Sequence, residues 1–205
     1  MTLLVIWFSI LGYFSGSVLY ASLIPQVFGN MDIRELSSDG NPGTANVFSV
    51  CGAKYGVPTA ILEFAKGFVP VTAAWFILRP ENMGMLYVPI IIAPVLGHMF
   101  SIFNHFRGGV GIAPAFGTLI AVFFGTRLLI ILVIIYSLAR WGFRIKNRHK
   151  RSTVVFVTFL IGTLVLETNS IYRMAYSLLS AMILVKNHGL KRRAGNLNKV
   201  TLEYE

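Results

Sequence analysis

The chain has 205 residues, 55% of them hydrophobic and only 13% charged, with a mean hydropathy of +0.69. A soluble domain carries about a quarter charged residues, so this composition excludes a soluble enzyme or binding domain and predicts a polytopic membrane protein. We assign the formal net charge of +10 to cytoplasmic loops and to contact with anionic lipid headgroups, rather than to nucleic-acid binding. Cys51 is the only cysteine, which excludes an intrachain disulfide.

Apolar runs along the chain predict an all-α fold, a bundle of about seven transmembrane helices that forms a single integral membrane domain over residues 1–205. The expected spans are 3–28, 55–78, 83–104, 111–125, 126–143, 152–167 and 169–187. The fourth and sixth are short, because about 20 apolar residues are needed to cross a bilayer. In the first span, Gly12 and Gly16 stand at a spacing that allows a neighbouring helix to approach closely.

Positively charged residues set the expected orientation of these spans. The densest group of Lys and Arg residues lies at 140–151, and the positive-inside rule puts it in the cytoplasm. The N-terminus is then expected outside and the C-terminus in the cytoplasm. The first run is expected to be a retained span, since its start lacks the basic region of a cleavable signal peptide. On this topology the loop at 29–54, the turn at 97–113 and the C-terminal tail face the cytoplasm together, which predicts one composite site at the inner membrane surface.

Two polar segments lie before the third span. The loop at 29–54 is rich in Ser, Gly and Asn, and tight turns of such residues can point backbone N–H groups at an anion. An ordinary solvated turn around Asn41-Pro42-Gly43 fits this composition equally well. In the second span, Glu63 and Lys66 share one helix face and can form an ion pair. Charges inside a span indicate a functional site, although an ion pair that only fastens the bundle is an equal alternative.

The third polar segment is the turn at 97–113, which contains His98, Arg107, Gly108, Gly109 and Gly111. Polar, glycine-rich backbone at the edge of a span is costly unless something polar binds there. Backbone N–H groups of glycine can approach a phosphate closely because glycine has no Cβ atom. Arg107 can hold a phosphate with paired hydrogen bonds. His98 can relay a hydroxyl proton, and a purely structural histidine is equally compatible with the sequence.

Taken in chain order, these motifs resemble the signatures of the bacterial acyl-phosphate:glycerol-3-phosphate acyltransferases, the PlsY family. The segment 32–46, with Gly40-Asn41-Pro42-Gly43, is similar to the first signature, and Glu63-Phe64-Ala65-Lys66-Gly67 is similar to an acidic-x-x-Lys-Gly segment of that family. The turn at 97–113 is similar to its glycine-rich second signature, and His188 occupies the position of its third. The family has seven spans in the same orientation, and the ordered set of motifs covers most of the chain.

The resemblance implies transfer of a fatty acyl group from acyl phosphate to the 1-hydroxyl of glycerol 3-phosphate, which gives lysophosphatidic acid for phospholipid synthesis in the bacterial inner membrane. These substrates and membrane lipids are the implied partners. No cofactor or metal is implied, and the sequence carries no signal for an oligomeric state. The implied catalytic residues are His188 and His98. The implied substrate-binding residues are Ser38, Gly40, Asn41, Gly43, Asn46, Arg107, Gly108, Gly109 and Gly111, and the implied supporting residues are Glu63 and Lys66.

The sequence departs from the family pattern where phosphate-binding cations are expected. Val110 stands where the second signature has lysine, and the stretch 48–50 has no counterpart of an arginine that follows the first signature. Asp39 adds a negative charge in the first signature, and His188 is not followed by the asparagine of the family's His-x-x-Asn. The candidates to replace the missing cations are Arg107, Lys191, Arg192 and Arg193.

These departures leave alternatives open. One is an inactive relative, or one with another acceptor, that binds lipid or a partner enzyme. Another is a small transporter in which Glu63, Lys66 and His98 form an ion or proton path. Because the polar residues cluster at the cytoplasmic ends of the spans, the sequence favours chemistry on lipid at the membrane surface over transport.

Overall fold

The computed structural model describes the backbone of residues 1–203 and the side chains of residues 1–191. Every regular element in this range is helical, which confirms the predicted all-α fold. The α-helices are α1 (Thr2–Ser17), α2 (Tyr20–Gly29), α3 (Ile33–Leu36), α4 (Thr44–Cys51), α5 (Ala53–Leu78), α6 (Pro80–Met83), α7 (Val88–Met99), α8 (Ile112–Ala121), α9 (Leu128–Ser137), α10 (Arg148–Leu166) and α11 (Ser170–Glu203). The shorter elements are the 3₁₀ turns η1 (Gly84–Tyr87), η2 (Ile102–Asn104) and η3 (Phe123–Gly125) and the π-helical turn η4 (Leu138–Gly142).

Each apolar run that the sequence predicts as a span contains at least one helix, but several runs are broken. In the described part of the chain, α5, the stretch Pro80–Asn104 and α10 are each long and apolar enough to cross a membrane. Helices α1 and α2 meet at a 40° bend and make a fourth such segment when they are taken as one span. Helix α8 and the stretch Leu128–Gly142 are apolar but shorter. The count of seven crossings and the orientation of the termini stay predictions.

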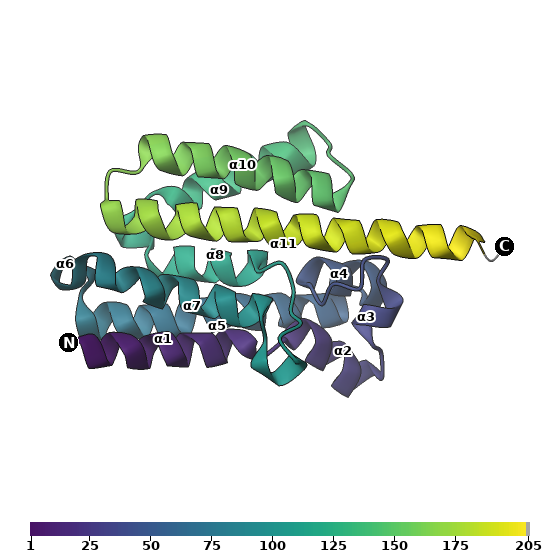
Figure 1. The fold of residues 1–205 in the computed structure, drawn as a ribbon, viewed down its shortest axis with the longest axis horizontal. Helices are drawn as coiled ribbons and strands as arrows, with labels where there is room; N and C mark the ends of the chain where they lie inside the picture. Colours follow the sequence, from purple (N-terminus) through teal and green to yellow (C-terminus); the bar gives the residue numbers. More distant parts are fainter. Residues whose placement is uncertain (204–205) are drawn as a thin grey trace.

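Figure 1 shows where the polar segments lie relative to these helices. Helices α2, α3 and α4, the glycine-rich turn between α7 and α8, and the connection from α9 to α10 all lie toward one end of the bundle, on the right of the view. The N-terminus, α6 and the connection from α10 to α11 lie at the other end. Segments that are far apart in the sequence therefore meet at one end, and α11 runs past them as it leaves the bundle (Figure 1).

Glycines let α1 lie directly against the backbone of α7. A Cβ atom added at Gly16 would lie 1.9 Å from the carbonyl oxygen of Pro94, and one at Gly97 would lie 2.0 Å from that of Tyr13. Gly12 faces the ring of Pro94, with 3.1 Å between an added Cβ and Cδ. The predicted role of Gly12 and Gly16 in close helix packing is confirmed.

The same kind of contact brings α5 against α8. A Cβ atom at Gly67 would lie 2.2 Å from the carbonyl oxygen of Pro114, and one at Gly117 would lie 2.1 Å from that of Phe64. We expect Gly67→Ala to lower the thermal midpoint of the purified protein, because the helices must move apart at a cost of about 1–3 kcal/mol. Gly162→Ala on α10 is the control, since its added Cβ has no neighbour closer than 3.8 Å. An equal drop in both variants would contradict the packing argument.

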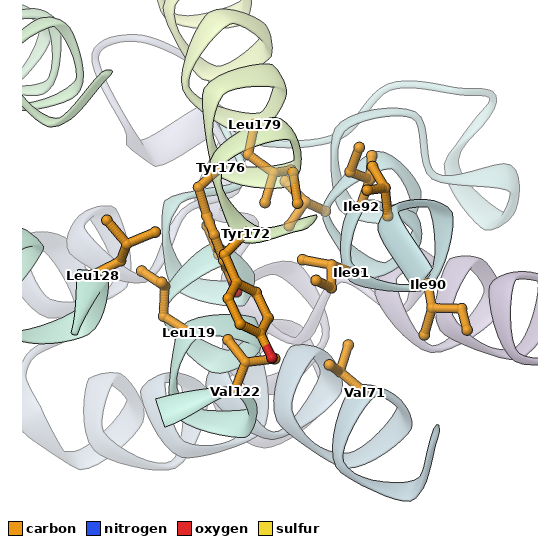
Figure 2. Packing of buried hydrophobic residues seen from close by; sticks show 14 of the residues in the cluster. Val71, Ile90, Ile91, Ile92, Leu119, Val122, Leu128, Tyr172, Tyr176 and Leu179 are labelled. Atoms are coloured by element: carbon orange, nitrogen blue, oxygen red, sulfur yellow. The ribbon is translucent and has the colours of Figure 1, made fainter. Parts of the chain in front are cut away.

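Side chains from several helices, including α5, α7, α8, α9 and α11, fill the apolar core beside these contacts (Figure 2). The core includes Val71 from α5, Ile91 from α7, Leu119 from α8, Leu128 from α9 and Tyr176 from α11, each at most 1% exposed. Many large apolar side chains on the outer surface are exposed, as expected for helices that face lipid tails. The core fixes α5, α7 and α11 against one another, and these three helices carry several residues of the candidate site.

Candidate active site

The first span is broken between α1 and α2, and the break leaves backbone groups without helical partners. Val18 is extended and Leu19 is not helical. Lys66 Nζ donates to the carbonyl oxygen of Val18 at 2.7 Å, and Glu63 Oε1 accepts from the N–H of Ala21 at 3.1 Å. The ammonium lies at the C-terminal end of α1 and the carboxylate at the N-terminal end of α2, the favourable arrangement for both helix dipoles. Lys66 and Glu63 of the second span thus supply the hydrogen-bond partners that the backbone of the first span lacks at its break.

Glu63, Lys66 and His98 form one buried cluster, and their side chains are at most 4% exposed. Lys66 Nζ lies 2.7 Å from Glu63 Oε2 and 2.8 Å from His98 Nδ1, and Glu63 Oε2 lies 3.2 Å from His98 Nδ1. An ammonium donates hydrogens and has no lone pair, so the contact of Lys66 Nζ with His98 Nδ1 requires the ammonium as the donor. We therefore assign His98 Nδ1 as an acceptor, which puts the ring proton on Nε2.

The glycine-rich turn folds back onto His98. A Cβ atom at Gly108 would lie 1.7 Å from the carbonyl oxygen of His98, and one at Gly109 would lie 2.4 Å from His98 Nε2 and 3.2 Å from Asn41 Oδ1. Gly111 has a φ of +94°, a value that favours glycine, and precedes the first residue of α8. The turn therefore contacts both His98 and the loop of the first signature.

Asp39 organises the first loop from inside. Its Oδ1 accepts from the N–H of Asn41 at 3.1 Å and from Asn46 Nδ2 at 2.7 Å, and Asn46 Nδ2 also donates to the carbonyl oxygen of Asn41 at 2.7 Å. Asn41 Oδ1 and Thr44 Oγ1 are buried and have no hydrogen-bond partner in the described part of the chain, and both residues line a cavity. Buried polar atoms are normally hydrogen-bonded, so these two favour a ligand that brings polar groups to the cavity.

An apolar cavity of about 340 Å³ lies between these groups, within the size range of small-molecule sites. Its apolar lining includes Phe48, Phe64, Val110, Ile112, Phe116 and Tyr136. Its polar lining includes Asp39, Asn41, His98, Arg148, His149 and Asn187. The polar groups come from the first loop, α7, α10 and α11, so the cavity exists only in the folded bundle.

Asn187 orients His149 at the polar side of the apolar cavity. Asn187 Nδ2 donates to the His149 carbonyl oxygen and to Thr153 Oγ1, both at 3.0 Å, which turns Asn187 Oδ1 toward His149 Nδ1, also at 3.0 Å. Because an amide oxygen only accepts, we assign the proton of the neutral ring to Nδ1. His149 Nε2 then lies 3.4 Å from Asp39 Oδ2 and is the ring nitrogen that can take up or release a proton.

A second cavity, of about 830 Å³, adjoins the first and shares Asp39, Phe48, Arg148 and His149 with it. We call it the basic cavity. Its lining contains the cationic side chains of Arg140, Lys146, Arg148 and Arg151. Because these residues lie in the connection from α9 to α10 or next to it, the basic cavity has its positive charge on the side opposite the first loop.

Five of the thirteen residues that the sequence predicts for the site line the cavities. Asn41, Gly43, His98 and Gly111 line the apolar cavity, and Ser38 lines the basic cavity. Other predicted residues support these linings without reaching them: Gly40 turns the first loop with a φ of +59°, and Asn46, Gly108 and Gly109 hold the contacts described above.

Two predicted residues lie elsewhere. Arg107 and His188 are exposed and line neither cavity. Lys191 is also exposed, and the side chains of Arg192 and Arg193 lie outside the described residues. Among the described residues, no group of three or more His, Cys, Asp or Glu side chains is arranged to hold a metal ion.

Sequence reasoning missed Arg148, His149 and Asn187. The first two lie within the basic run at 140–151. That run was interpreted only as a signal for the orientation of the spans in the membrane, so its two site residues were not singled out. Asn187 directly precedes His188, and successive residues of a helix point about 100° apart. Helix α11 therefore turns Asn187 into the bundle and His188 outward. The pair Asn187-His188 in the sequence could have directed attention to Asn187 as well as to His188.

Comparison with known proteins gives consistent matches. A family model described as glycerol-3-phosphate acyltransferase matches residues 6–194. A glycerol-3-phosphate acyltransferase of Lawsonia intracellularis is 34% identical over 138 residues, which cover 67% of each chain. Glycerol-3-phosphate acyltransferase 1 of Lactobacillus johnsonii is 38% identical over 104 residues, 51% of this chain and 49% of the relative, so the chain spans about half the length of that relative. The crystal structure of PlsY, an integral membrane glycerol 3-phosphate acyltransferase in its glycerol 3-phosphate form, superposes with a TM-score of 0.76 at 25% identity, covering 98% of this chain and 94% of PlsY.

Proposed function

We propose that this chain, which belongs to the glycerol-3-phosphate acyltransferase family, transfers a fatty acyl group from acyl phosphate to the 1-hydroxyl of glycerol 3-phosphate. The product is lysophosphatidic acid. One observation carries the proposal: an apolar cavity and a basic cavity share a wall that contains Asp39, Arg148 and His149. The two substrates have the matching parts: the acyl chain suits the apolar cavity, and the phosphate groups of acyl phosphate and of glycerol 3-phosphate both suit the basic cavity, so that the reacting carbonyl and hydroxyl groups meet at the shared wall.

The apolar cavity suits the acyl chain next to the reacting carbonyl. Acyl phosphate is already activated, so the enzyme mainly has to orient two anionic substrates and stabilise the charge that develops during transfer. In this arrangement His98 donates its Nε2–H to the carbonyl oxygen. Asn41 Oδ1, a buried acceptor without a partner, accepts from a hydroxyl group of glycerol 3-phosphate.

His149 is our candidate for the proton acceptor. The hydroxyl oxygen of glycerol 3-phosphate forms a bond to the carbonyl carbon, and its proton moves to His149 Nε2. The bond from that carbon to the phosphate oxygen breaks, and His149 returns the proton to the departing phosphate. His98 is less suited to this role because Lys66 occupies its second ring nitrogen. His188 has no contact with either cavity that would support a direct role.

The membrane assignment follows from the same arrangement. Residues of the first loop and of the start of α10 line both cavities, and these two segments lie toward the same end of the bundle (Figure 1). The basic run at 140–151 belongs to that end, and the positive-inside rule puts such a run in the cytoplasm. We therefore propose a multi-pass protein of the bacterial inner membrane, with its N-terminus outside and its C-terminus and substrate site on the cytoplasmic side.

The test is acyl transfer by the purified full-length chain in lipid nanodiscs, supplied with acyl phosphate and glycerol 3-phosphate. We expect lysophosphatidic acid to form and the chain to complement a bacterial strain that lacks its own enzyme. No lysophosphatidic acid above the level of protein-free nanodiscs would contradict the proposal. Product formed only with another acceptor alcohol would assign the chain to a different acyl transfer.

A further inference from the structure

We propose that the phosphate group of glycerol 3-phosphate binds in the basic cavity, where the Arg148 guanidinium, at the start of α10, holds it. The inference rests on the proposed function for the identity of the phosphate monoester. It assigns the phosphate to cations that lie outside the three sequence signatures.

Arg148 is the one lysine or arginine among the described residues that line the apolar cavity, and it also lines the basic cavity. Val110 lines the apolar cavity and is 7% exposed within the apolar core, and Phe48 lines that cavity on the side of the first loop. These positions, one within and one next to the sequence signatures, are those where the family pattern has cations. A cation at either position would have to replace an apolar contact, so the positive charge must come from another segment.

The basic cavity has the positive charge that a phosphate needs, and one of its cations has unused hydrogen-bonding capacity. Arg151 is 8% exposed, and its guanidinium donates to the carbonyl oxygen of Ile145 at 2.9 Å while stacking over Tyr136, with 5.8 Å from Cζ to the ring centroid. Its Nε is buried without a hydrogen-bond partner. Arg140 and Lys146 also line the cavity, and Asp39 is the one carboxylate among the described residues of its lining.

Arg148 is the cation best placed to bind the phosphate. Its Nη1 lies 4.0 Å from Asp39 Oδ2 and its Nη2 lies 3.4 Å from Ser49 Oγ, so both contacts are at the outer limit for such interactions. A phosphate offers a guanidinium two parallel charge-assisted bonds of about 2.7–2.9 Å. The side chain is about one-third exposed and borders both cavities, so it can reach a phosphate while the hydroxyl of the same molecule lies beside His149.

Asp39 competes with the phosphate for Arg148. Its Oδ1 is used by the first loop, whereas its Oδ2 faces only Arg148 and His149 among the contacts of the described residues. A bound phosphate would therefore replace Asp39 as the anion next to Arg148. Asparagine at position 39 keeps the acceptor Oδ1 and removes the competing charge.

The test is binding without catalysis. Full-length protein in zwitterionic nanodiscs is titrated with inorganic phosphate and with glycerol 3-phosphate by calorimetry. We expect Arg148→Gln to weaken both affinities by about tenfold or more and Asp39→Asn to strengthen them severalfold. Lys150→Gln is the matched control, because it removes the same charge from the same turn of α10 at an exposed side chain that lines neither cavity.

Unchanged affinity in Arg148→Gln, or an equal loss in Lys150→Gln, would overturn the inference, and retained thermal midpoints show that the variants are folded. A second arm uses nanodiscs that contain lysophosphatidic acid, which has the same phosphate monoester on a lipid. Dependence on Arg148 in that arm alone would overturn the assignment to the soluble substrate. Acyl transfer that persists while phosphate binding ignores Arg148 refutes the site but leaves the proposed function intact. If phosphate binding depends on Arg148 but no acyl transfer occurs, the phosphate site is supported and the proposed function is refuted.

Discussion

Replacing His149 by glutamine is expected to lower kcat for acyl transfer by about a hundredfold or more, the usual contribution of a positioned general base. Glutamine retains hydrogen-bonding capacity but cannot take up the hydroxyl proton. Because Arg148 remains in place to hold the phosphate, KM for glycerol 3-phosphate should change little. The measurement is the initial rate of lysophosphatidic acid formation at saturating acyl phosphate and varied glycerol 3-phosphate.

The same assay decides between two histidines. His188→Gln tests the assignment that the third signature implies, and His105→Gln is the control, an exposed histidine that lines neither cavity. We expect both variants to keep wild-type kcat. A large loss in His188→Gln with normal turnover in His149→Gln would show that the sequence-based assignment is right and ours is wrong.

Replacing Lys66 by methionine should destabilise the fold by about 3–5 kcal/mol, the usual penalty for removing one partner of a buried ion pair. The substitution leaves Glu63 charged and buried and leaves the carbonyl oxygen of Val18 without its donor. The thermal midpoint in detergent, followed by the fraction that stays monodisperse, measures the loss. Lys54→Met, on an exposed position of the same helix, is the control.

The double variant Glu63→Gln, Lys66→Met separates the effect of the unpaired Glu63 charge on stability from the effect of the hydrogen bonds that the two side chains make. It removes the uncompensated carboxylate, while the glutamine Oε1 still accepts from the N–H of Ala21, so it should regain part of the stability that Lys66→Met loses. If Lys66→Met melts at the same temperature as Lys54→Met, the cluster does not stabilise the fold, and the transporter alternative regains its proton path.

Apolar runs predicted the helices well because burial in lipid leaves the backbone no other way to satisfy its hydrogen bonds. The break in the first run was not predictable in the same way. No glycine or proline occurs at Ser17-Val18-Leu19, and the groups that stabilise the break, Glu63 and Lys66, belong to another span. A local pattern cannot report a helix end that a distant side chain satisfies.

The candidate site likewise contains residues that local motifs predict and residues that only tertiary contacts identify. Motifs in the turns predicted Asn41, Gly43, His98 and Gly111, since close backbone packing restricts the residue types there. The sequence did not predict His149 as a site residue, because its contact with Asn187 forms only when α10 packs against α11. The family resemblance implies a lysine where this chain has Val110, and whether another residue supplies that charge depends on tertiary contacts that the sequence does not show.

The bend between α1 and α2 also bears on how the helices assemble in the membrane. The carbonyl of Val18 and the N–H of Ala21 find their partners on α5, and each unsatisfied backbone group in hydrocarbon costs several kcal/mol. The two backbone groups at the bend therefore gain their partners only when α5 packs against α1 and α2, so assembly of these three helices, and not the first apolar run alone, satisfies the bend.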